Sequence, residues 1–127
     1  MPRYVILRHE TPLGGPRPSH WDFMLEQGDV LRTWAIELSP DEPAPQPALL
    51  LPDHRAAYLT YEGPVSNNRG EVSRWDEGTF ATSCEVAGDH LELELNGRRM
   101  RGRVSLIKRV ETATNGEPIF DFHYRAG

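Results

Sequence analysis

The amino-acid sequence predicts one mainly β domain over residues 1–127, folded as a small antiparallel β-barrel with little helix. Glycine and proline, 11 residues of each, interrupt the chain at short intervals. Many of the segments between them are short and apolar, or alternate apolar and polar residues with the two-residue period of a half-buried strand. No segment keeps an apolar period of 3.6 residues over three helical turns. Short strands at this spacing are typical of an antiparallel sandwich or a small barrel.

Each expected strand is an apolar or alternating run bounded by turn residues. In order, the runs are Tyr4–Arg8, His20–Glu26, Val30–Glu37, Ala48–Leu51, Ala56–Tyr61, Glu71–Trp75, His90–Leu95, Arg98–Val110 and Ile119–Tyr124. The dipeptide at 96–97, Asn-Gly, is the strongest hairpin signal, and Asp-Glu-Gly at 76–78 is also expected to form a turn. Four prolines between residues 39 and 47 predict an irregular loop. Residues 53–59 are also a candidate for one helical turn.

The charge balance narrows the classes of function. The chain has 14 basic and 19 acidic residues, a net charge of −5 and a pI near 5.5. A domain that coats duplex DNA by charge alone is usually basic, so that mode of binding is disfavoured. Recognition of a nucleic-acid end needs only a local positive site and stays open.

The sequence also indicates the cellular compartment in which the protein is expected. No run approaches the roughly 20 apolar residues of a membrane helix, and a strand-like run begins almost at Met1, which leaves no room for a signal peptide. The single cysteine, Cys84, allows no internal disulfide and is expected to be buried and inert. We therefore expect a cytoplasmic protein with no membrane contact.

The segment His20-Trp21-Asp22 is the most informative for chemistry. Residues i and i+2 of a strand point to the same face, about 7 Å apart, so the imidazole and the carboxylate lie on one side. Together they offer half of a divalent-metal site, and mixed nitrogen and oxygen ligands suit Mn²⁺ or Zn²⁺. His9 and His54 follow other apolar runs and could join such a site. A surface histidine hydrogen-bonded to a nearby aspartate explains the pair equally well.

Six sequence blocks occur in the order known from one family. The blocks are Arg3–His9, His20–Glu26, Asp29–Ile36, Asp53–Gly63, Gly70–Phe80 and Leu95–Leu106. With these blocks the chain resembles the 3′-phosphoesterase domain found at the N-terminus of bacterial DNA ligase D and in stand-alone bacterial and archaeal proteins. The resemblance implies a small β-barrel that uses Mn²⁺, or Zn²⁺ or another divalent cation in its place, to process 3′ ends of DNA or RNA.

The resemblance also implies roles for individual residues. The metal ligands fall on His9, His20 and Asp22, and His54 matches the histidine that acts in catalysis at the scissile phosphate. Tyr58 matches a nearby tyrosine and is expected, with Arg55, to bind substrate. The implied partners are a 3′ end of DNA or RNA, held locally, and a repair ligase or polymerase.

Three departures from the family remove positive charge. Met24, Leu38 and Gln46 stand where the family has an arginine, a lysine and an arginine, side chains suited to gripping phosphate. The loop between His9 and His20 is also longer than in the family. Four arginines offer replacements from new positions: Arg8, Arg17, Arg55 and Arg69. Three hypotheses follow. The first is a divergent metal-dependent phosphoesterase in DNA repair, and the second is a catalytically impaired module that binds a metal or a nucleic-acid end beside a repair ligase or polymerase. The third is a purely structural partner of such an enzyme, in which the histidines have no role.

Overall fold

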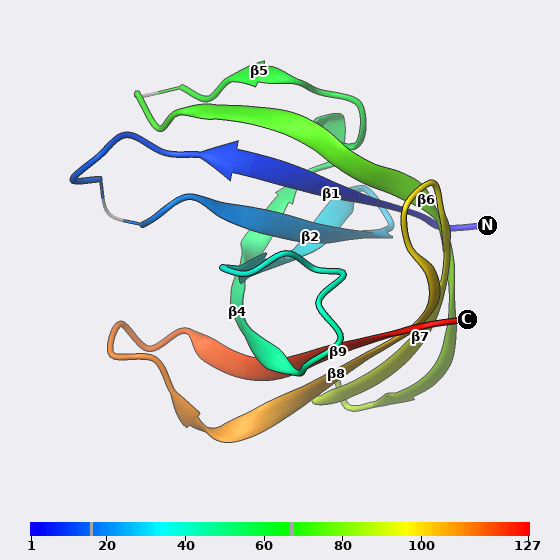
Figure 1. The fold of residues 1–127 in the computed structure, drawn as a ribbon. Helices are drawn as coiled ribbons and strands as arrows, with labels where there is room; N and C mark the ends of the chain where they lie inside the picture. The colour runs from blue at the N-terminus through cyan, green and yellow to red at the C-terminus, as the bar shows by residue number, and fades with distance from the viewer. Residues whose placement is uncertain (16, 67) are drawn as a thin grey trace.

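The chain folds into a closed antiparallel β-barrel. The computed structural model describes residues 1–15, 17–66 and 68–127. Its strands are β1 Arg3–Glu10, β2 His20–Gln27, β3 Val30–Ile36, β4 Gln46–Arg55, β5 Gly63–Pro64, β6 Glu71–Val86, β7 His90–Gly97, β8 Arg101–Thr112 and β9 Pro118–Ala126. The order is β1-β2-β3-β4-β9-β8-β7-β6, and β6 pairs with β1 to close the barrel (Figure 1). The short β5 pairs with the start of β6. The predicted small antiparallel barrel is confirmed.

The barrel interior is filled by apolar side chains from every strand that closes it. Alternate residues of each strand point inward, which follows from the two-residue period of a strand. Aromatic rings meet edge to face at the centre: the ring centroids are 5.3 Å apart for Phe23 and Phe122, and 5.6 Å apart for Trp34 and Phe120. This cluster accounts for the alternation seen in the sequence of β2, β7 and β8.

A second apolar cluster lies on the opposite face of β1, β2 and β3. It consists of Val5, Leu7, Met24, Leu31, Leu59, Val65 and Val72, with Tyr58 packed against it. The chain between β4 and β6, which contains the short 3₁₀ helix η1 (Ala56–Leu59) and β5, covers this face. Strands β1 and β2 are therefore buried on both sides, and polar side chains at their ends lie beside a sheltered pocket rather than in open solvent.

The strand expected at residues 56–61 and the turn expected at 76–78 are both wrong. Strand β4 continues to Arg55, and η1 replaces the expected strand. Strand β6 continues through Asp76, which is buried. Its carboxylate accepts hydrogen bonds from the backbone N–H groups of Arg98, Arg99 and Met100 and from the hydroxyl of Tyr4. These donors are distant in the sequence, and they supply the hydrogen bonds that a buried carboxylate needs, so Asp76 can lie within a strand.

Two smaller expectations also need correction. The loop expected to end at residue 47 gives way to β4 at Gln46. Cys84 is exposed rather than buried, because it lies on the part of β6 that extends past the core. Among the described residues, no helix has the length and apolar character needed to cross a membrane.

Candidate metal centre

Three side chains meet where β1 ends and β2 begins. His9 and His20 are direct partners in the antiparallel β1–β2 pair, and Asp22 follows His20 by two residues on the same face. One nitrogen from each histidine and one oxygen of Asp22 all lie within 4.8 Å of one another. The antiparallel pairing thus brings His9 to the pair that the spacing of His20 and Asp22 predicts.

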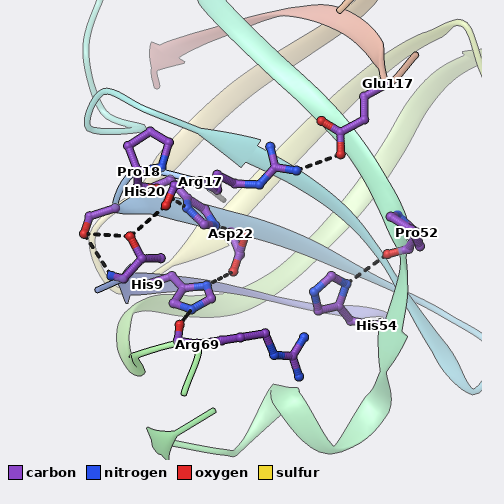
Figure 2. A network of polar contacts seen from close by, with 11 residues as sticks. His9, Arg17, Pro18, His20, Asp22, Pro52, His54, Arg69 and Glu117 are labelled. Atoms are coloured by element: carbon purple, nitrogen blue, oxygen red, sulfur yellow. Dashed lines mark hydrogen bonds and ion pairs between the residues drawn. The ribbon is translucent and has the colours of Figure 1, made fainter. Parts of the chain in front are cut away.

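Backbone carbonyls determine which nitrogen of each imidazole carries hydrogen. His20 Nδ1 lies 2.8 Å from the Pro18 carbonyl oxygen, and His9 Nε2 lies 2.8 Å from that of Arg69 (Figure 2). A carbonyl only accepts, so these nitrogens donate, and in a neutral ring the other nitrogen is left with a free lone pair. Those free nitrogens face Asp22: His20 Nε2 is 2.9 Å from Oδ1 and His9 Nδ1 is 3.4 Å from Oδ2.

The Asp22 carboxylate is buried without full hydrogen bonding. Within the described part of the chain, its Oδ1 atom has no hydrogen-bond partner, because the short approach of His20 Nε2 lacks hydrogen-bond geometry. Burial alone would raise the pKa of Asp22, but the positive charge that the His20 and His9 rings carry when protonated outweighs it and lowers the pKa to about 2. The same contact raises the pKa of His9. When both rings are neutral, two nitrogen lone pairs face a negative carboxylate. This donor set could hold a shared cation such as Mn²⁺ or Zn²⁺ in place of the protons.

A pocket of about 700 Å³ opens beside this cluster. Its lining includes the three clustered residues and also His54, Arg55 and Tyr58, the other residues singled out from the sequence. His54 lies near the end of β4, and its Nδ1 is 2.9 Å from the Pro52 carbonyl oxygen. The Tyr58 ring meets the His54 ring edge to face, with centroids 5.8 Å apart. The structure thus places every predicted site residue on one pocket.

The four candidate arginines differ in position. Arg17, Arg55 and Arg69 line the pocket. Arg8 points to the other face of β1, where it bonds to Glu10 and stacks 4.2 Å from the centroid of the Trp21 ring. Three of the four arginines are therefore placed to contact a ligand in the pocket.

The three positions at which the resemblance implies basic residues are filled in other ways. Met24 is buried in the pocket wall, and Leu38 is exposed. Gln46 is buried, and its amide group bonds to the backbone of Leu38 and Ser39, which holds the preceding loop against β4. None of these three side chains can donate a charged hydrogen bond to phosphate.

Several groups at the site were not predicted. The carbonyls of Pro18 and Arg69 orient the two histidines, but every residue type offers a carbonyl, so no sequence signal marks them. Glu117 lines the pocket and pairs with Arg17 at 2.7 Å. It comes from the turn before β9, 100 residues away in the chain, and only the barrel closure brings it near.

The fold and the site define a β-barrel with a sheltered cluster of two histidines and one aspartate beside a pocket. The model of the family described as the DNA ligase D 3′-phosphoesterase domain matches residues 9–108, and the chain belongs to this family. This confirms the resemblance found in the sequence.

Curated relatives include two multifunctional non-homologous end joining proteins. The chain is 33% identical over 122 residues to the DNA repair protein LigD of Mycobacterium tuberculosis, in a match that covers 90% of this chain and 15% of the relative. It is 28% identical over 115 residues to LigD of Pseudomonas aeruginosa, covering 84% of this chain and 13% of the relative. The chain therefore spans about one seventh of the length of the relatives that it matches.

Proposed function

We propose that this chain is a divalent-metal-dependent phosphoesterase that acts on 3′-phosphate or ribonucleotide ends in DNA repair, with Mn²⁺ as its metal. Family membership supports a role in processing DNA ends. One observation carries the metal dependence: ligand atoms of His9, His20 and Asp22 lie within 4.8 Å of one another, and a buried oxygen of Asp22 has no hydrogen-bond partner among the described residues. A divalent cation is the group that relieves this arrangement.

The first task of the proposed site is to hold the metal and orient the substrate. His9, His20 and Asp22 would bind the cation, held in place by the carbonyls of Arg69 and Pro18. When bound, the cation supplies Lewis-acid polarisation of a phosphoryl oxygen. Tyr58 and Arg55, on the same pocket, would contact the substrate beside it.

The second task, proton transfer, falls to His54. Its Nδ1–H donates to the Pro52 carbonyl, which fixes the ring and leaves Nε2 as the atom that exchanges protons (Figure 2). With a proton on Nε2, His54 would donate to the oxygen that leaves the phosphate. The Tyr58 ring meets the His54 ring edge to face on the same pocket.

The test is release of inorganic phosphate from a 3′-phosphorylated DNA primer. We expect release that requires Mn²⁺ in the wild type and is absent in His20→Ala and strongly reduced in His54→Ala. A His90→Ala variant, whose histidine bonds to Glu92 outside the pocket, serves as the matched control and is expected to keep full activity. Release that is unaffected by EDTA or by His20→Ala would refute the proposal.

A second candidate function rests on Met24, Leu38 and Gln46. Because these side chains carry no charge where the family has basic residues, a module that binds a 3′ end without turning it over, in support of a repair ligase or polymerase, is the alternative. Binding of a 3′-phosphorylated primer with Mn²⁺ but without release would favour this function. Robust turnover lost in His54→Ala would exclude it.

A further inference from the structure

Arg69 occupies a fixed position at the wall of the pocket. Its carbonyl accepts a hydrogen bond from His9, and the next residue, Gly70, packs against the end of β1. Gly70 has φ of +97°, and a Cβ at this position would collide with the carbonyl oxygen of Glu10. The Gly70 carbonyl also accepts from the backbone N–H of Val65. These contacts fix the backbone that follows residue 69, whose carbonyl orients a ligand of the proposed metal site.

The guanidinium of Arg69 is held at one edge. Its Nε donates to the Ser66 carbonyl at 2.8 Å and one terminal nitrogen donates to Ser66 Oγ at 3.1 Å. A guanidinium has five N–H donors, so three are left without a partner in the described structure. The side chain lines the pocket and extends from the carbonyl below His9 in the direction of His54 (Figure 2).

The three arginines of the pocket differ in their ion pairs and hydrogen bonds. Arg17 is neutralised by Glu117 at 2.7 Å. Within the described ranges, neither Arg55 nor Arg69 forms an ion pair with a carboxylate, and of these two only Arg69 is tethered by hydrogen bonds. A tethered guanidinium loses less freedom when it binds an anion than a free one does.

We propose that Arg69 binds the terminal phosphate of the substrate through the free edge of its guanidinium. This inference rests on the proposed function and names the residue that grips the anion. One residue then serves both parts of the site, because its carbonyl orients His9 while its side chain holds the phosphate. Replacing the side chain leaves the carbonyl in place, so metal binding and phosphate binding should separate.

The test compares two single-stranded DNA probes that differ only in a 3′-phosphate or a 3′-hydroxyl, with EDTA present. Wild type should bind the 3′-phosphate probe more tightly, and Arg69→Gln should weaken that binding by about 10- to 100-fold, the usual effect of losing a charged hydrogen bond. Binding of the 3′-hydroxyl probe should change little. Arg69→Lys should restore part of the preference, because it restores the charge without the planar fork.

Arg8→Gln is the matched control, since Arg8 lies on the other face of β1, and it should bind both probes as wild type does. Mn²⁺ affinity should be unchanged in Arg69→Gln. An Arg69→Gln protein that keeps the wild-type preference, or a wild type with no preference for the 3′-phosphate, would overturn the assignment. Neither result depends on turnover, so failure of Mn²⁺-dependent release in the wild type would count against the proposed function alone.

Discussion

Two aspartates, Asp22 and Asp76, are buried to the same extent but have opposite surroundings. Each is 2% exposed, and each lies on a strand that pairs with β1. Asp76 accepts hydrogen bonds from three backbone N–H groups and from the Tyr4 hydroxyl. Asp22 faces the imidazoles of His9 and His20, and one of its oxygens lacks a hydrogen-bond partner in the described structure. Equal burial thus marks a structural residue in one case and a candidate ligand in the other.

The largest expected difference between the two aspartates is in activity. Asp22→Ala should lower phosphate release from a 3′-phosphorylated primer by at least about 1000-fold, because it removes a ligand of a cation that contributes several kcal/mol to the reaction. Asp22→Asn, which keeps the shape but not the charge, should also be strongly impaired. Asp76→Asn should stay within about tenfold of wild type at a temperature where it is folded. Equal losses in the Asp22 and Asp76 variants would erase the distinction.

Stability should show the reverse pattern. Asp76→Ala leaves the backbone N–H groups of residues 98–100 without their acceptor, so the free energy of unfolding should fall by about 3 kcal/mol or more. Asp22→Ala, measured in EDTA, should lower it by less than Asp76→Ala does. The contact with His20 and His9 that lowers the pKa of Asp22 is lost, but no backbone N–H group is left without an acceptor. Urea denaturation of both variants measures the difference. A larger loss for Asp22→Ala would show that Asp22 is the structural residue.

Metal should stabilise the protein only through Asp22. Mn²⁺ at 100 times its dissociation constant should raise the free energy of unfolding by about 2.7 kcal/mol in wild type. Mn²⁺ should raise the free energy of unfolding of Asp76→Ala by a similar amount, although this variant is less stable without metal. It should not stabilise Asp22→Ala. Thermal unfolding in Mn²⁺ and in EDTA measures this stabilisation for each variant. Stabilisation of Asp22→Ala by Mn²⁺ would show that the metal binds elsewhere.

The smallest expected effect concerns pH and the Tyr4–Asp76 pair. Burial, together with the hydrogen bond to Asp76, raises the pKa of Tyr4 far above its usual value. Tyr4 then stays protonated in the folded state while the unfolded chain ionises, so its contribution is complete below about pH 10 and falls by about 1.4 kcal/mol per pH unit above it. Tyr4→Phe lacks this contribution. The difference in free energy of unfolding between wild type and Tyr4→Phe should therefore shrink from pH 10 to about pH 11. Urea denaturation at both pH values measures this difference, and a difference that does not change with pH would contradict the prediction.

The sequence predicts the barrel and the His20–Asp22 face well because both follow from the two-residue period of a strand. It cannot predict the second apolar cluster, since alternation in β2 indicates one buried face and the cover comes from η1 and Val65. The strand at Asp76 also escapes prediction, because Asp-Glu-Gly is typical of a turn and only contacts with Tyr4 and residues 98–100 hold Asp76 in a strand. The carbonyls that orient His9 and His20 carry no sequence signal.

Calorimetric titration of the metal-free protein with Mn²⁺ tests the metal centre most directly. We expect one-to-one binding in wild type and in Asp76→Asn, and no binding in Asp22→Ala. No binding in wild type, or equal binding in Asp22→Ala, would contradict the claim that His9, His20 and Asp22 form a metal centre.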